Sequence, residues 1–170
     1  MLQNTTIRLA NVSDMPALSR VHVASWQAAY RHILPDEVLD NLSVEQFETN
    51  WKRNFSDTQR VNLVLEIDTS VSGFIAFGSS RDDDATVKTG EIYGLYLIPE
   101  LWGAGGGRAL WDEASQLLQA RFSVLTLWVL QNNTRARNFY ERIGFQCDDQ
   151  LKNISLYGVE LPEVRYRKNL

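Results

Sequence analysis

Residues 91–110 read EIYGLYLIPELWGAGGGRAL, and this stretch decides the fold. Its first part, Glu91 to Ile98, is predicted to be a strand that ends at Pro99, because proline cannot donate to a strand ladder. A glycine cluster from Gly103 to Gly107 follows and leads into a helix. The residues of this helix that we expect to face inward are Leu110, Ala114, Leu117 and Leu118. The stretch predicts a strand, a glycine-rich turn and a helix in succession.

The glycine-rich turn has the properties of an anion site. Glycine lets a ligand approach bare backbone N–H groups, and a helix start adds unpaired donors and the positive end of the helix dipole. Arg108 places a cation in the first helical turn, near the positive end of the helix dipole. This position is unfavourable for a cation by itself and becomes favourable if an anion binds nearby. A glycine-rich turn without a ligand has the same composition, so the turn alone leaves both interpretations open.

Two well-known phosphate motifs do not match this turn. The dinucleotide fingerprint requires glycine at its sixth position, which is Arg108 when counted from Gly103. The P-loop requires Gly-Lys-Ser/Thr, which is absent. A nucleotide-binding protein that uses the loop differently is therefore the weaker interpretation.

The elements on either side of residues 91–110 predict an α/β fold, an α+β-like mixed sheet with helices on both faces. Before them we expect a strand at 7–9, a helix that Ser13 caps, a loop at 35–40, a helix that begins with a capping box at 43–46, and a hairpin of strands 61–67 and 71–77. After them we expect a strand at 124–130, a helix at 133–143, and two antiparallel strands at 154–157 and 164–166. The first helix has apolar stripes on two sides, which indicates that it is deeply buried or lines a cleft as well as a core.

The composition is that of an ordinary globular protein. The 170 residues suit one domain that spans residues 1–170, with 44% apolar and 22% charged residues. The net charge of −4 argues against a general nucleic-acid partner. The sequence shows no secretory signal and no apolar run of about 20 residues, and its one cysteine, Cys147, excludes an internal disulfide. We expect a cytoplasmic protein with no membrane partner.

Several segments together resemble the GNAT superfamily of acetyl-CoA-dependent N-acetyltransferases. Residues 133–145 contain Asn-x-x-Ala-x-x-Phe-Tyr-Glu-x-x-Gly-Phe, which is similar to a signature of that family. The strand at 91–99, the ending at 161–168 and the N-terminal segments at 25–30 and 33–35 also resemble it. The turn is similar to the family's pyrophosphate loop, Gln/Arg-x-x-Gly-x-Gly/Ala, because Gly105-Gly106-Gly107 fits its second half. Trp102 stands where the family has Gln or Arg, which puts a side-chain contact to the cofactor in doubt.

The resemblance implies a GNAT-like fold, in which a central, twisted and mostly antiparallel sheet is splayed in the middle and acetyl-CoA lies in the split. It also implies direct transfer of the acetyl group to an amine, with no acyl-enzyme and no metal. The residues that it implies for cofactor binding are Leu95, Leu97, Trp102, Gly103, Ala104, Gly105, Gly106, Gly107, Arg108, Asn133 and Tyr140. Among them, the backbone N–H of Leu95, where the resemblance implies that the strand is bulged and splayed, is implied to stabilise the carbonyl oxygen, and Leu97 to pair with the pantetheine chain. Asn133 has a structural alternative as a helix N-cap, and Arg108, Arg135 and Arg137 are candidates for a basic patch.

The transfer needs a base for the amine and an acid for the leaving thiolate. Regular strand alternation places Glu91, Tyr93, Leu95 and Leu97 on one face, and Glu91 is the candidate base, acting directly or through water. Its alternative is a strand-edge carboxylate that faces solvent. Tyr140 is the candidate acid, as the resemblance implies, and its alternative is a core aromatic residue.

The amine acceptor cannot be identified from the sequence, so small molecules and protein amines are both open, as is a homodimer. Trp26 and Tyr30 are candidates for the wall of the acceptor site, with core packing as the alternative. His22 and His32 are too few and too far apart for a metal site. A non-catalytic acyl-CoA-binding regulatory module on the same fold is the alternative function, against which the presence of Glu91 and Tyr140 argues.

Overall fold

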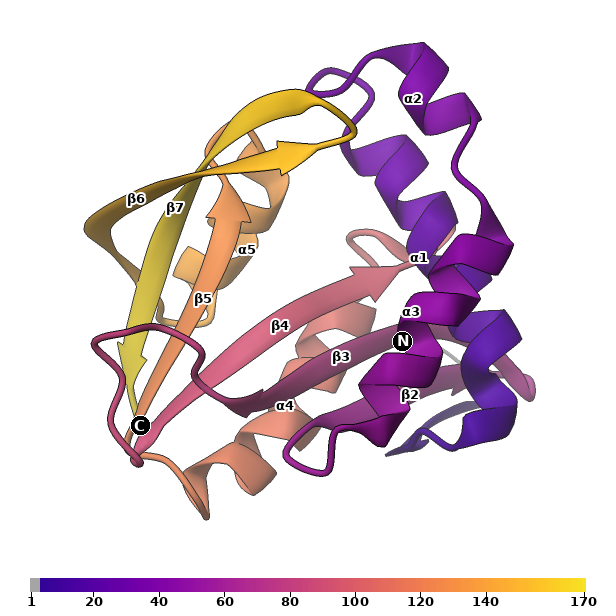
Figure 1. Ribbon diagram of the computed structural model, residues 1–170. Coiled ribbons are helices and arrows are strands. Elements are labelled where there is room, and N and C mark those ends of the chain that lie inside the picture. Colours follow the sequence, from indigo (N-terminus) through magenta and orange to yellow (C-terminus); the bar gives the residue numbers. More distant parts are fainter. Residues whose placement is uncertain (1–3) are drawn as a thin grey trace.

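The computed structural model describes residues 4–170. In this part of the chain it contains seven strands and five α-helices (Figure 1). The strands are β1 (Thr5–Leu9), β2 (Val61–Ile67), β3 (Ser70–Ser79), β4 (Thr89–Leu97), β5 (Val124–Leu130), β6 (Gln146–Leu156) and β7 (Val159–Asn169). The helices are α1 (Met15–Ala29), α2 (Asp36–Asp40), α3 (Val44–Ser56), α4 (Gly106–Gln119) and α5 (Thr134–Arg142). None of the helices in residues 4–170 has the length and apolar character that a membrane span requires.

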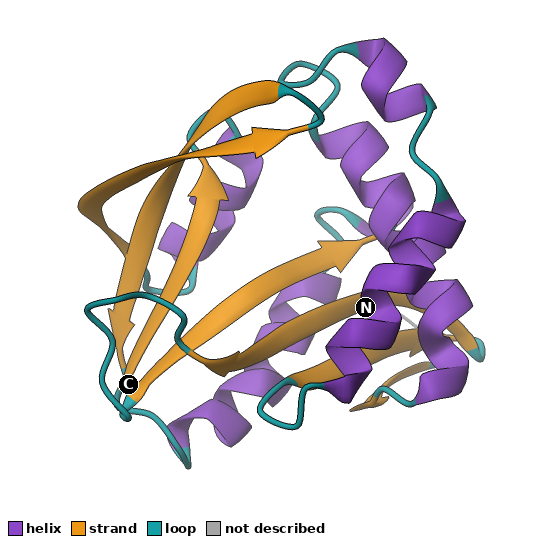
Figure 2. Ribbon diagram, in the orientation of Figure 1, coloured by secondary structure: helices purple, strands orange, loops and turns teal. Residues whose placement is uncertain are grey.

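All seven strands form one sheet in the order β1-β2-β3-β4-β5-β7-β6. Every neighbouring pair is antiparallel except β4 and β5, which run parallel because α4 crosses from the end of one to the start of the other (Figure 2). The predicted mixed and mostly antiparallel sheet is confirmed.

The sheet splits between β4 and β5. These strands pair only from Thr89–Val124 to Ile92–Leu127, and beyond that point they diverge, as Figure 1 shows. On its other edge β4 continues to pair with β3 as far as Leu97. The second half of β4 therefore has one backbone edge that no strand covers, and the predicted splay is confirmed.

A β-bulge at Tyr93 reverses the side-chain alternation within β4. Ile92 pairs with Phe77 and the next pair is Gly94 with Ala76, so Tyr93 has no opposite residue. The extra residue puts Ile92 and Leu95 on the same face, whereas regular alternation would put them on opposite faces. The prediction that Glu91 shares a face with Leu95 and Leu97 is wrong for this reason, because Glu91 lies on the other face.

The two faces of the sheet have separate cores. On one face α4 and α5 cover a cluster that includes Ile92, Leu110 and Tyr140. On the other face α1 and α3 cover a cluster that includes Leu18 and Trp51. A third cluster joins α1 and α2 to β5 and β7, and Tyr30 belongs to it. The α1 helix contributes to the second and third clusters, which agrees with the apolar stripes predicted on two of its sides.

Most element boundaries agree with the predictions, and the exceptions have local causes. The α1 helix begins at Met15, because Asn11 caps a 3₁₀ turn over Val12–Asp14 that precedes it; Ser13 is not the cap. The stretch predicted as a loop contains α2, whose single turn shows no periodicity in the sequence. Strands β6 and β7 are both longer than the predicted 154–157 and 164–166. Most of the side chains of β6 are exposed and polar, so its first part gave no strand signal in the sequence. Leu117, predicted to face inward, is 42% exposed.

Candidate active site

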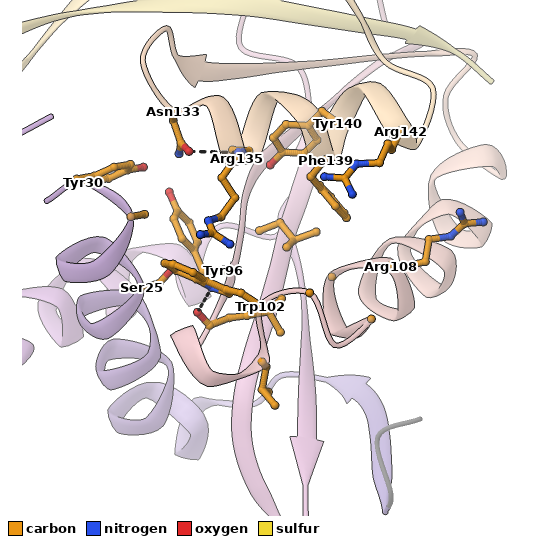
Figure 3. A pocket seen from close by; sticks show the side chains of 18 residues that line it. Ser25, Tyr30, Tyr96, Trp102, Arg108, Asn133, Arg135, Phe139, Tyr140 and Arg142 are labelled. Carbon is orange, nitrogen blue, oxygen red and sulfur yellow. Dashed lines mark hydrogen bonds between the residues drawn. The ribbon is translucent and has the colours of Figure 1, made fainter. Parts of the chain in front are cut away.

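A cavity of about 340 Å³ lies at the uncovered edge of β4. Its walls come from the second half of β4, the glycine-rich loop with the start of α4, α5 and the end of α1 (Figure 3). The predicted site residues that line it are Tyr30, Leu95, Leu97, Trp102, Gly103, Gly105, Gly107, Arg108, Asn133 and Tyr140. Three separate stretches of the chain, within residues 25–30, 95–108 and 133–142, therefore meet at one cavity.

The glycine-rich loop presents bare backbone to this cavity. Gly103 and Gly105 have φ angles of 79° and 96°, and a Cβ atom at either position would meet no heavy atom within 4 Å. Gly105 is the N-cap of α4, and the first N–H groups of a helix have no intrahelical acceptor. Open space beside unpaired donors at a helix start fits a phosphate group. Ala104 and Gly106, which were also predicted to bind the cofactor, are not among the residues that line the cavity.

Trp102 links the loop to β4 and to α5. Its indole Nε1–H donates to the Leu97 carbonyl at 3.2 Å, and the Arg135 guanidinium carbon lies 4.3 Å from the centroid of its rings. The residue that departs from the family pattern is therefore fixed at the wall of the cavity (Figure 3).

The backbone of β4 directs two N–H groups into the split. The N–H of Ile98 donates to Ser72 in the direction of β3, and backbone groups of a strand alternate between its two edges. The N–H groups of Leu95 and Leu97 therefore point toward the uncovered edge. They are available to a ligand in the cavity.

Three tyrosines line the cavity: Tyr30, Tyr96 and Tyr140. Burial raises the pKa of each phenol, so each is protonated and can donate a hydrogen bond at neutral pH. In Figure 3 the hydroxyls of Tyr30 and Tyr96 point toward one another. Sequence reasoning missed Tyr96, because the bulge that turns it toward α1 leaves no mark in the alternation of side chains.

Glu91 is buried, with 2% of its surface exposed, and does not line the cavity. Its carboxylate accepts hydrogen bonds from the backbone N–H of Arg81 at 2.9 Å, from Nε of Arg81 at 3.1 Å and from Nη2 of the same residue. The alternative of a solvent-facing carboxylate is wrong.

Of the two remaining candidate residues, Asn133 lines the cavity and Trp26 does not. Trp26 packs against His22, Tyr30 and Phe47 rather than lining the cavity. Asn133 both lines the cavity and caps α5, since its Oδ1 accepts from the Ala136 N–H at 3.2 Å. Residues 4–170 contain no cluster of His, Cys, Asp and Glu that could hold a metal ion.

The arginines predicted as a basic patch are not all at the cavity. Arg108 lines it, but its Nε lies 2.7 Å from the Asp112 carboxylate in an exposed ion pair. Arg135 and Arg142 also line the cavity, and Arg142 was not predicted. Arg137 does not, because it donates to the Tyr166 hydroxyl and the Gln131 carbonyl.

Comparison with known proteins identifies a family from the sequence. The model of the acetyltransferase (GNAT) family matches residues 22–145. The N-acetyltransferase YuaI of Bacillus subtilis, itself uncharacterized, is 33% identical over 162 residues, which are 94% of this chain and 90% of that protein.

Two solved structures have the same fold. PaiA N-acetyltransferase from Thermoplasma acidophilum, solved with coenzyme A, has a TM-score of 0.75 at 23% identity, over 98% of this chain and 99% of that one. YncA from Salmonella typhimurium, solved with acetyl-CoA, has a TM-score of 0.72 at 19% identity, over 98% and 94% of the two chains. With the cavity, the glycine-rich loop and the split sheet in place, the family match assigns this chain to the GNAT family of N-acetyltransferases.

Proposed function

We propose that the cavity binds acetyl-CoA and that the chain transfers its acetyl group directly to a primary amine. The observation that supports this most is the continuity of one cavity from the glycine-rich loop to the uncovered edge of β4. A phosphate-binding end and a strand edge with free N–H groups suit a pyrophosphate joined to an amide-containing arm.

The phosphate end of the cofactor is assigned to the loop. The N–H groups at the start of α4 and the cations of Arg135 and Arg142 would face the pyrophosphate. Leu97 would pair with the amide-containing arm through its backbone N–H. The Leu97 carbonyl already accepts a hydrogen bond from the Trp102 indole N–H. This hydrogen bond fixes the orientation of the strand edge at Leu97.

The reacting end is assigned to the split. The amine nitrogen forms a bond to the thioester carbon, the carbon–sulfur bond breaks, and the thiolate takes a proton. The N–H of Leu95 would stabilise the charge that develops on the carbonyl oxygen. Tyr140, buried and protonated, would give the proton to the thiolate.

Glu91 is proposed to accept the amine proton through water. The carboxylate lies on the face opposite Leu95 and does not reach the cavity, so a direct contact with the amine has no support. Three hydrogen bonds from Arg81 leave room for about one more donor on its oxygens. We also propose a cytoplasmic location, which suits a chain whose one cysteine is exposed and unpaired.

The test is a panel of primary amines with acetyl-CoA, in which release of free thiol is followed. Turnover of at least one amine, with the acetyl group found on its nitrogen by mass spectrometry, is expected. Firm binding of coenzyme A with no turnover of any amine would instead favour a regulatory module.

A further inference from the structure

The carboxylate of Glu91 is held by the loop that connects β3 to β4. Within residues 4–170, the hydrogen bonds that it accepts all come from Arg81, through the backbone N–H at 2.9 Å, Nε at 3.1 Å and Nη2. The Arg81 side chain is 66% exposed, so the surrounding fold does not enclose it. The position of the Glu91 carboxylate therefore depends on the position of the loop backbone at Arg81.

The residues that follow Arg81 fix this loop to the other side of the split. Asp82 accepts from Nε1 of Trp128 on β5 at 2.7 Å and from Nη1 of Arg165 on β7 at 3.3 Å. Asp84 accepts from Nη1 of the same guanidinium at 2.7 Å and from Nη2 at 2.8 Å. Figure 1 shows the loop beside the marked C-terminus, where β7 ends. The loop thus joins β4 to β5 and β7.

The anchor of the loop, Arg165, lies on the same face of the sheet as Glu91. Glu91 pairs with Thr126 of β5, and Arg165 pairs with Trp128 of β5. Because Thr126 and Trp128 are two positions apart in one strand, all four side chains project from one face. Arg165 is only 5% exposed, and a buried guanidinium is costly unless carboxylates accept its hydrogen bonds. The loop is therefore anchored to a buried group of the sheet.

The Arg165 guanidinium is shared between the loop and β6. Asp82 and Asp84 contact it from the loop, and Asp148 of β6 accepts from its Nε at 2.8 Å. The hydrogen bonds with Asp84, more than the one with Asp148, raise the pKa of Arg165 against the effect of burial. Loss of Asp84 would therefore loosen the loop, whereas loss of Asp148 would leave both loop contacts in place.

We propose that Arg165 is a positioning residue for the acetyl transfer. Through Asp82 and Asp84 it fixes the loop, and from this loop Arg81 orients the carboxylate of Glu91. A group that takes a proton through water must be held at hydrogen-bonding distance, so a displaced carboxylate lowers the rate without weakening cofactor binding. This inference rests on the proposed transfer and on the proposed role of Glu91 in it, and adds the residues that hold Glu91 in place.

A double-mutant cycle between the loop anchor and Glu91 tests this role. Asp84→Asn removes a carboxylate that is 58% exposed, so the fold should be kept. We expect kcat to fall roughly 10- to 100-fold with KM for acetyl-CoA unchanged, since a misplacement of about 1 Å can cost about 100-fold. In the Glu91→Gln background the same substitution should cost less than about twofold, because the group that it positions is already lost. Asp148→Asn, the matched control, should keep the parent kcat.

Hydrogen exchange of the Arg81 backbone amide, followed by NMR, measures the loop anchor without turnover. This N–H donates to Glu91, so we expect it to be protected in the parent. Its exchange should become at least about 10-fold faster in Asp84→Asn. The same is expected in Arg165→Lys, which keeps the charge and loses the planar fork. Asp148→Asn should exchange as the parent does.

Parent-like exchange of the Arg81 amide in Asp84→Asn and Arg165→Lys would overturn the proposal. An unchanged kcat in Asp84→Asn would also overturn it, as would equal losses from this substitution in the parent and Glu91→Gln backgrounds. If Arg165→Lys does not fold, Asp84→Asn decides alone. If no amine is acetylated although coenzyme A binds, the proposed function fails, and the exchange measurement by itself then decides whether Arg165 holds Arg81 against Glu91.

Discussion

The indole N–H of Trp102 donates to the backbone carbonyl of Leu97 at 3.2 Å, which ties the glycine-rich loop to the strand that precedes it. The two residues are five positions apart and lie on the same cavity wall. The hydrogen bond therefore fixes the loop relative to the strand edge to which the cofactor arm is assigned.

Trp102→Phe removes this hydrogen bond and leaves a ring to stack on Arg135. One hydrogen bond is worth about 0.5–1.5 kcal/mol, so we expect the affinity for acetyl-CoA to fall roughly 2- to 12-fold. Trp102→Gln, which restores a side-chain N–H donor, is expected to recover part of the loss. Calorimetric titration measures both, and parent-like affinity of Trp102→Phe would show that the hydrogen bond is irrelevant to binding.

Gly105→Ala tests the phosphate assignment with a matched control. The φ of 96° at Gly105 and of 79° at Gly158 strains any other residue, by roughly 1–2 kcal/mol, and a Cβ atom meets open space at both. Both alanine variants should therefore lose similar stability in thermal unfolding. Only Gly105→Ala should also weaken coenzyme A binding, because Gly158 lies in the turn between β6 and β7. Equal affinities in the two variants would remove Gly105 from the phosphate site.

Residues 91–110 predicted the strand, the turn and the helix because each depends on local chemistry: a proline stop, a glycine cluster and an apolar helical stripe. The family resemblance implied a bulge in this strand at Leu95, but its position at Tyr93 and the resulting change of face were not predicted, because one inserted residue leaves the composition of a strand unchanged and reverses only its faces. The hydrogen-bond partners of the Glu91 carboxylate could not be predicted from the sequence either. Its partner Arg81 reaches it from a loop that Arg165 holds through Asp82 and Asp84, and these contacts between distant residues cannot be read from spacing.

Glu91→Gln keeps the shape of the side chain and removes its basicity. If Glu91 accepts the amine proton through water, the rate should fall roughly 10²- to 10⁴-fold, and the deficit should shrink as the pH rises and more free amine is present. Glu66→Gln is the matched control, because Glu66 also accepts from an arginine, Arg8, but lies on β2, which β3 separates from β4. A deficit that is constant across pH would indicate a structural role for Glu91.

His22 predicts a loss of stability in acid. Burial lowers its pKa from an ordinary value of about 6.5 to about 3, so between these values the unfolded chain binds the proton and the folded chain does not. The contribution is complete above about pH 6.5 and is lost as the pH falls toward 3. The free energy of unfolding should thus drop by up to about 1.4 kcal/mol per pH unit more than in His22→Phe. His32→Gln, at an exposed position, should keep the parent slope; a parent slope in His22→Phe would contradict the assignment.

Tyr140→Phe separates proton donation from packing. The ring packs edge-on against Phe139 and Phe145 at an interplanar angle of 67° to each, and the variant keeps these contacts while it removes one hydroxyl. If the hydroxyl protonates the leaving thiolate, kcat should fall roughly 10²- to 10⁴-fold with little change in coenzyme A affinity, because the interaction forms only in the transition state. A thioester with a more acidic thiol should then restore part of the rate. Tyr157→Phe, at an exposed turn, should behave as the parent, and Tyr96→Phe compares the neighbouring phenol. Full turnover by Tyr140→Phe together with a large loss in Tyr96→Phe would transfer the acid role to Tyr96.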